Sequence, residues 1–116
     1  MNGCVFCDIV AGESPAADYR ACGTENVAFT PLNPVTDGHT LVVPRVHVKD
    51  ATTMYTVSAE TMKWAAILAS HFHSANIITS IGAPATQSVY HLHLHVVPRR
   101  EGDGLTLPWT GQEVGR

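Results

Sequence analysis

This chain of 116 residues lacks long hydrophobic runs, basic clusters and an even number of cysteines. No apolar stretch approaches the roughly 20 residues of a membrane-spanning helix, so no membrane partner is expected. Lys and Arg together number seven and the net charge is −3, which offers no basic surface to a nucleic-acid partner. The N-terminal segment lacks the basic start of a secretory signal. These absences favour a cytoplasmic protein with neither a membrane nor a nucleic-acid partner.

The cysteine count is odd, since the chain has three. An odd count argues against a disulfide framework and favours a reducing compartment. Cys4 and Cys7 form a C-x-x-C pair, which alone fits a redox pair, half of a zinc site or two packed thiols. A redox pair of the thioredoxin kind should follow a strand, which the residues before Cys4 are too few to form. Cys22 is expected to be a small buried hydrophobe.

Apolar residues make up 45% of the chain, enough for one modest core. Residues 1–116 are therefore expected to form a single domain, with an irregular tail over 99–116. The hydrophobic pattern predicts helices over 5–11 and 58–75, a loop over 12–18, and strands over 26–32, 39–43, 77–81 and 89–97. Strands joined by one long helix indicate an α+β fold, with the helix covering one face of a mostly antiparallel sheet.

The longer helix is expected to begin with Ser58 as its N-cap. Its buried face is predicted to consist of Met62, Ala65, Ala69 and Phe72. Trp64 and Ile67 lie off this face, which allows a second apolar face that meets a partner subunit. A helix buried in the core explains the same pattern.

Histidine occupies every second position from His91 to His95. In a strand these side chains share one face, and Leu92 and Leu94 share the other, which is the core side. The histidine row fits a solvated polar face, a metal site or a catalytic centre. At about 3.3 Å per residue the outer two backbones stand about 13 Å apart, too far for all three rings to bind one ion. Catalysis is the favoured interpretation, with the rings on an open face.

Three segments together carry a family resemblance. HLHLHVV within TQSVYHLHLHVVPR is similar to the signature His-φ-His-φ-His-φ-φ of the histidine-triad (HIT) superfamily, where φ is apolar. NPVTDGHTLVVPRVHV resembles a second segment of that family, with Asp37 where Pro is usual and Arg45 where Lys is usual. CVFCDIVAGESPA resembles the family's N-terminal segment, and the whole is most similar to the bacterial Hint-like branch.

The resemblance implies a HIT-like fold, with about five mostly antiparallel strands, one long helix and a short N-terminal helix. It implies a nucleotidyl hydrolase or transferase that acts on nucleoside monophosphates through a covalent nucleotidyl-histidine intermediate. By position His93 is the nucleophile, His95 the acid beside the leaving group, His91 the orienting neighbour and His39 a fourth active-site histidine. Gln87 and Ser88 are expected to bind phosphate oxygens or the leaving group. A dinucleoside polyphosphate hydrolase or phosphorylase, and a non-catalytic binding module, remain alternatives.

The resemblance also implies a nucleotide pocket and a metal site. The base pocket falls by position on Val5, Phe6, Ile9, Phe29 and Leu32. The family commonly binds ribose with an Asp where this chain has Pro31, and Asn33 is the nearest substitute. Zinc-bearing relatives use a Cys pair with two histidines, which are here Cys4, Cys7, His47 and His91, and such a zinc ion is structural. Family members are homodimers whose C-terminal tails reach the partner's site, so Trp109 is either a packing or an active-site residue.

Overall fold

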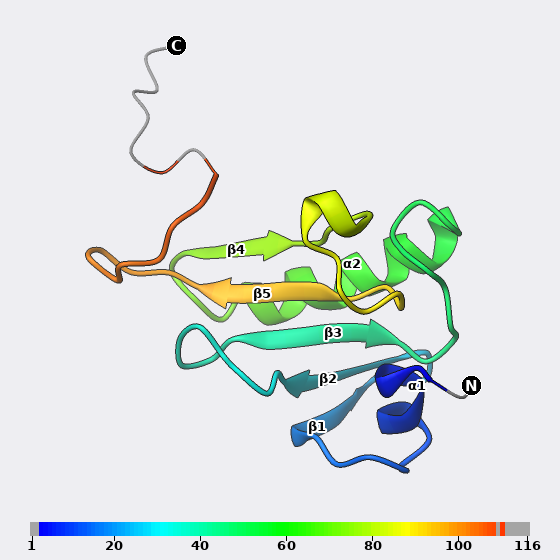
Figure 1. Ribbon diagram of the computed structural model, residues 1–116. Coiled ribbons are helices and arrows are strands. Elements are labelled where there is room, and N and C mark those ends of the chain that lie inside the picture. The colour runs from blue at the N-terminus through cyan, green and yellow to red at the C-terminus, as the bar shows by residue number, and fades with distance from the viewer. Residues whose placement is uncertain (1–2, 109, 111–116) are drawn as a thin grey trace.

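A computed structural model describes residues 3–108 and 110 of the chain. Five strands form one antiparallel sheet in the order β1-β2-β3-β5-β4, which confirms the predicted α+β class (Figure 1). The elements in chain order are α1 (Val5–Val10), β1 (Ala17–Cys22), β2 (Asn26–Thr30), β3 (Thr40–Pro44), α2 (Tyr55–Ala69), β4 (Ala75–Ile78), the 3₁₀ turn η1 (Ala83–Ala85) and β5 (Leu94–Pro98). Within the described residues, no helix has the length and apolar character needed to span a membrane.

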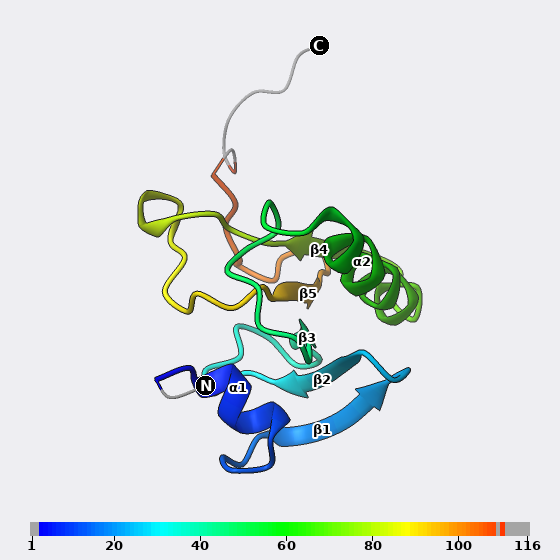
Figure 2. The same cartoon turned by 90° about the vertical axis from the view of Figure 1, so that its right-hand side faces the viewer.

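The two helices cover opposite faces of the sheet (Figure 2). Beneath α2 a buried cluster joins Val42 of β3 to Leu94 and Val96 of β5 and to Ala65 of the helix. On the other face a second cluster joins α1 to β2 and β3, and it contains Cys4, Phe6, Ile9, Val27, Phe29, Leu41 and Val43. Neighbouring residues of β3 thus enter different clusters, because successive side chains of a strand point to opposite faces. The face under α1 is also the face that carries the histidines.

Strand β1 is the element that the sequence pattern misses. It is an edge strand whose first five residues are exposed, so it has no apolar alternation to reveal it. Its pairing with β2 is irregular between Ala17 and Arg20, where Asp18 has a positive φ of 56°. The irregularity begins inside the segment that the pattern assigns to a loop.

The long helix differs from its prediction in both its ends and its buried face. It begins at Tyr55 after Met54, so the prediction of Ser58 as N-cap is wrong, and the Ser58 hydroxyl instead donates to the Ala51 carbonyl at 2.7 Å. Residues Met62 and Phe72 are exposed, whereas the core contacts come from Val57, Thr61, Trp64, Ala65, Leu68 and Ala69. The buried face is thus turned away from Met62, and the helix ends at Ala69 instead of residue 75.

Candidate active site

The predicted strand over 89–97 is shorter in the structure: residues 89–91 form a bend, and the chain joins the sheet only at Leu94. The predicted alternation nevertheless holds, since Leu92 and Leu94 are buried beneath α2. The expectation of an open row is wrong for His91, whose side chain is fully buried, while His93 and His95 are half-buried. The three rings therefore stand in different surroundings and have different chemistry available to them.

His93 is held in one tautomer by the backbone. Its Nδ1 lies 2.8 Å from the carbonyl oxygen of His91, which can only accept, so Nδ1 carries the proton and Nε2 keeps its lone pair. The Phe6 ring packs edge-on against His93, with centroids 5.0 Å apart. Burial lowers the pKa of His93, which keeps the ring neutral near pH 7. His91 is thus placed to orient His93, through its backbone carbonyl and not through its ring.

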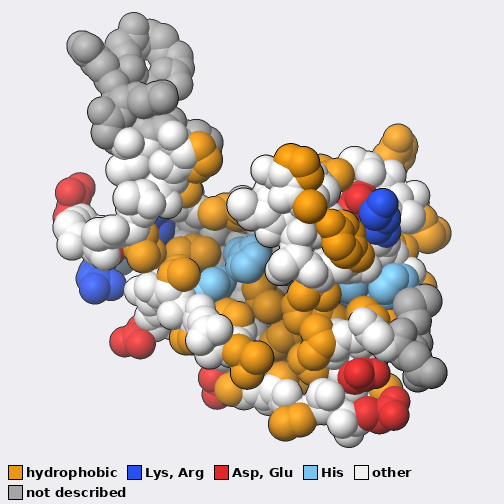
Figure 3. All heavy atoms as spheres, viewed as in Figure 1, with side chains coloured by type: hydrophobic (Ala, Val, Ile, Leu, Met, Phe, Trp, Pro, Cys, Tyr) orange, Lys and Arg blue, Asp and Glu red, His pale blue; other side chains and the backbone are white. Residues whose placement is uncertain are grey.

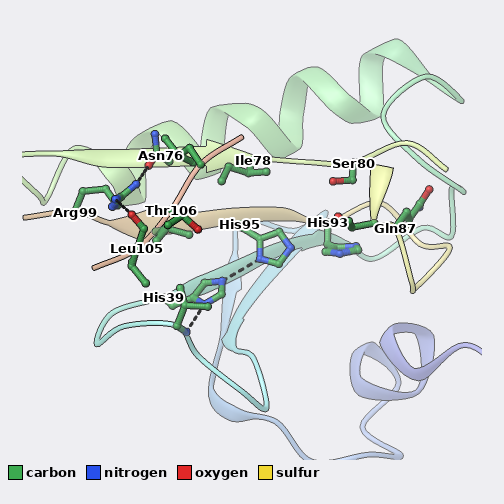
Figure 4. Close-up of a pocket in the computed structure, with 14 residues that line it drawn as sticks. His39, Asn76, Ile78, Ser80, Gln87, His93, His95, Arg99, Leu105 and Thr106 are labelled. Carbon is green, nitrogen blue, oxygen red and sulfur yellow. Dashed lines mark hydrogen bonds between the residues drawn. The ribbon is translucent and has the colours of Figure 1, made fainter. Parts of the chain in front are cut away.

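His39 and His95 form a hydrogen-bonded pair whose direction is fixed by a backbone amide (Figure 4). The Val35 N–H donates to His39 Nδ1 at 3.1 Å, so the proton of the His39 ring lies on Nε2. This Nε2–H points to His95 Nδ1 at 2.9 Å, which leaves the proton of the neutral His95 ring on its own Nε2. Burial, with smaller contributions from His93 and His39, lowers the pKa of His95 to about 4. Burial also lowers the pKa of His39, so both rings are neutral at pH 7.

His39, His93 and His95 open onto one cleft with a volume of about 360 Å³ (Figure 4). In the space-filling view one group of histidine side chains lies near the middle of this face, next to hydrophobic side chains (Figure 3). The other lining residues are Val35, Asn76, Ile78, Ser80, Thr86, Gln87, Val97, Arg99, Leu105, Thr106 and Leu107. His93, which has a free lone pair, and His95, which has an N–H group, therefore line the same cleft. His93 could attack an electrophile bound there, and the N–H group of His95 could stabilise the leaving atom.

Gln87 and Ser88 occupy different positions relative to the cleft. Gln87 is buried and lines it, but its amide group donates to the carbonyl oxygens of Lys49 and Val89 at 2.9 and 3.2 Å. Its Oε1 accepts from the Gly82 N–H at 2.8 Å. Both amide protons are thus engaged in holding the loop, whereas Ser88 is exposed and lies outside the cleft lining.

The residues expected to bind the base are split between core and surface. Phe6, Ile9 and Phe29 belong to the buried cluster beneath α1, next to His93. By contrast Leu32 is 95% exposed and Val5 is 44% exposed, and Asn33 is exposed too. None of the five apolar residues lines the cleft, so a base bound against them would lie on the other side of His93. Trp109 lies outside the described residues.

Cys4, Cys7, His47 and His91 form a compact cluster of ligand-type atoms. The His47 and His91 Nδ1 atoms are 3.2 Å apart, and the Cys7 Sγ lies 3.2 and 3.4 Å from them. The Cys4 Sγ lies 3.4 Å from His91 Nδ1. Four ligands around one tetrahedral zinc ion stand roughly 3.3–3.8 Å from one another, so the spacing fits.

The cluster also has the outer support that metal ligands use. His91 Nε2 lies 2.8 Å from the Pro44 carbonyl oxygen and must donate to it, which turns the Nδ1 lone pair toward the thiols. Burial and the neighbouring Cys4 raise the pKa of the Cys7 thiol to about 11. A bound cation would offset that cost, because thiols coordinate metals as thiolates. These four residues could therefore hold a metal ion.

The far part of the cleft extends beyond the predicted histidine row. Val97 shares the face of His93 and His95, as strand alternation predicts, and Arg99 continues the same two-residue spacing, which could have placed it there too. Leu105–Leu107 follow a turn in the chain and reach the cleft by folding back, which no periodicity signals.

Comparison with known proteins is consistent with this geometry. A family model described as the HIT domain matches residues 23–102, and the chain belongs to this family. It is 35% identical to "Protein hit" of Bacillus subtilis, over 93% of this chain and 79% of that protein. It is 32% identical to a protein of Arabidopsis thaliana named adenylylsulfatase HINT3, across all of this chain but 60% of that protein. A HIT family protein from Bacillus anthracis has a similar crystal structure, with a TM-score of 0.82 and 29% identity over 93% of this chain and 82% of that one.

Proposed function

We propose that the protein is a nucleotidyl hydrolase or transferase that forms a covalent intermediate at His93. Its substrates are nucleoside monophosphates that carry a leaving group in a phosphoramidate or adenylate linkage. The main support for this proposal is that hydrogen bonds fix the tautomers of two histidines lining one cleft. His93 has a lone pair on Nε2, and His95 has a proton on Nε2. The relative named as an adenylylsulfatase supports the adenylate class. Single-turnover reaction with an adenosine phosphoramidate, followed by mass spectrometry for an adduct on His93, tests the proposal.

The mechanism follows from the hydrogen bonds. His93 Nε2 attacks the α-phosphorus, the N–P bond forms and the bond to the leaving group breaks. The phosphorylated ring becomes cationic, and the His91 carbonyl that accepts from Nδ1 stabilises this charge. His95 offers its Nε2–H to the leaving atom, which takes up one proton from the medium. Water then attacks phosphorus, releases one proton and the monophosphate, and restores the neutral His93 ring.

We propose further that Cys4, Cys7, His47 and His91 bind one zinc ion. The supporting observations are the interatomic spacing, the Cys₂His₂ donor set and the Pro44 carbonyl that orients His91. Zinc would supply structural cross-linking only, since four protein ligands leave no position for water. His91 links this cluster to catalysis, because its ring is a ligand while its carbonyl oxygen holds His93.

A homodimer is proposed from the exposed side of α2. Tyr55, Ala59, Met62 and Ala66 are exposed and recur at helical spacing, so they form an apolar stripe on one side. Next to α2 in space, β4 is an edge strand that can also meet a partner. Trp64 contributes to the core instead of a second outer face.

Introducing a charge into this stripe is expected to separate the subunits. Met62→Glu should weaken dimerisation at least about a hundredfold, or 2.7 kcal/mol, because a carboxylate would be buried without a partner. Thr56→Glu adds the same charge at an exposed position outside the stripe and should leave the dimer intact. Sedimentation velocity at micromolar concentration measures both, and a monomeric wild-type protein would contradict the proposal.

Pro31 is expected to leave the sugar weakly recognised. It is half-buried just after β2 and has neither a side-chain acceptor nor an N–H donor, whereas an Asp could accept from both ribose hydroxyls. The wild-type kcat/KM ratio for ribo- over 2′-deoxyribo-phosphoramidates should lie near one and rise in Pro31→Asp. A wild-type ratio of about one hundred, roughly 2.7 kcal/mol, would mean that another group such as Asn33 already binds the hydroxyls.

A further inference from the structure

The nucleophile proposed at His93 lies just outside the sheet. Strand β5 begins one residue later, and its pairing with β4 ends at the pair of Ile78 and His95, so the ladder does not fix the backbone of residues 91–93. The hydrogen bond from His93 Nδ1 to the His91 carbonyl spans this same stretch. The direction of the ring therefore depends on the contacts that hold residues 91–93 in place.

Hydrogen bonds from other segments hold both ends of this stretch. At one end the Leu92 N–H donates to the Val48 carbonyl at 2.8 Å. At the other end the Thr79 hydroxyl donates to the His93 carbonyl, also at 2.8 Å. The first bond joins two backbone groups, which nearly every residue type supplies. The second bond needs a hydroxyl side chain, so it depends on which residue stands at position 79.

Thr79 follows the last residue of β4 and stands beside the cleft without lining it. Its neighbours Ile78 and Ser80 both line the cleft, whereas Thr79 is half-buried and absent from the lining (Figure 4). Successive side chains of an extended chain point to opposite faces, which accounts for this difference. The Thr79 hydroxyl can therefore influence a reaction in the cleft through the His93 backbone, and not by contact with a substrate.

We infer that Thr79 is a positioning residue for the reaction at His93. Its hydroxyl holds the His93 carbonyl, which keeps the ring in its bond to the His91 carbonyl and aims Nε2 at the phosphorus. This inference rests on the proposed function and adds a residue to its machinery. A displacement of a reacting atom by about 1 Å can cost about a hundredfold in rate, so a bond that does not touch the substrate has a measurable effect.

Removal of the hydroxyl should lower kcat and leave binding unchanged. Thr79→Val keeps the shape of the side chain, and kcat on an adenosine phosphoramidate should fall at least about tenfold while the Kd of a nucleoside monophosphate changes by less than about twofold. Thr79→Ala should show the same loss, whereas Thr79→Ser keeps the hydroxyl and should stay within about threefold of the wild-type kcat. Equal kcat values in the wild-type protein and Thr79→Val would overturn the inference.

Thr61→Val separates positioning from stability. Thr61 is fully buried outside the cleft lining, and its hydroxyl donates to Asn26 Oδ1 and to the Val57 carbonyl, both at 2.9 Å. The same substitution here should lower Tm at least as much as Thr79→Val does, because it leaves a buried acceptor without its partner. Its kcat should stay within about twofold of the wild-type value. An equal loss of kcat in the two variants would contradict a positioning role.

The tautomer of His93 tests the inference without turnover. Long-range ¹⁵N–¹H NMR of the ring, assigned by comparison with His93→Ala, should show the Nδ1–H tautomer alone in the wild-type protein and in Thr79→Ser, at a pH where the ring is neutral. Both tautomers should be populated in Thr79→Val. Absence of turnover in the wild-type protein would refute the proposed function while this comparison still tests the positioning role. Identical ring spectra of the wild-type protein and Thr79→Val would refute the positioning role even if the wild-type protein is active.

Discussion

Replacing His93 with Ala should reduce kcat on an adenosine phosphoramidate at least about a thousandfold, or roughly 4 kcal/mol of transition-state stabilisation. The reason is that no other group described at the cleft presents a free nitrogen lone pair held by the backbone. His95 Nδ1 is occupied by His39, and His39 Nδ1 is occupied by the Val35 N–H. The Kd of a nucleoside monophosphate should stay within about tenfold, since the ring acts mainly in the chemical step.

His73→Ala provides the matched control, because it removes an exposed histidine near the end of α2. Its kcat and thermal stability should match those of the wild-type protein. If His93→Ala retained a large fraction of wild-type turnover while folded, a covalent mechanism at this residue would be wrong.

Loss of the proposed zinc ion should have the largest effect on stability. The purified protein should carry one zinc ion per chain, and Cys4→Ser should lose it. Removing a ligand from a structural site abolishes folding energy that the metal supplies. A loss of about 3 kcal/mol would lower Tm by roughly 10–20 °C in a domain near this size. Turnover should also fall, because the backbone of the proposed ligand His91 accepts the hydrogen bond that orients His93.

Cys22→Ala is the control for this experiment. It removes a buried thiol that does not belong to the cluster of four ligand-type residues. It should keep the full zinc content. Elemental analysis that finds no zinc after preparation under reducing conditions would leave Cys4 and Cys7 as packed thiols and would refute the metal proposal.

The faces of the sheet were predictable from the sequence because they follow from local periodicity. Alternation alone places Leu92 and Leu94 in the core and the histidines opposite them, as the structure confirms. The different burial of the three rings was not predictable, because it depends on where distant segments pack. His91 is enclosed by α1 residues and His47, which lie more than 40 residues away in the chain.

The tautomers and the far wall of the cleft depend on single hydrogen bonds, which leave no trace in a residue pattern. The proton of His39 is placed by the Val35 amide, in a loop whose geometry the sequence does not specify. Arg99 and Asp103 look like any nearby pair of opposite charges until the turn brings Leu105–Leu107 against the cleft. Strand β1 was not predicted because it is an exposed edge strand, whose residues need no apolar alternation.

The covalent intermediate at His93 can be detected directly. The wild-type protein should be mixed with an adenosine phosphoramidate in excess, quenched in acid-free denaturant within a single turnover, digested and analysed by mass spectrometry. An adenylyl group is expected at Nε2 of His93, on the peptide that contains this residue, and no such adduct is expected in His93→Ala. An adduct on another residue, or turnover with no protein adduct at any quench time, would contradict a covalent mechanism at His93.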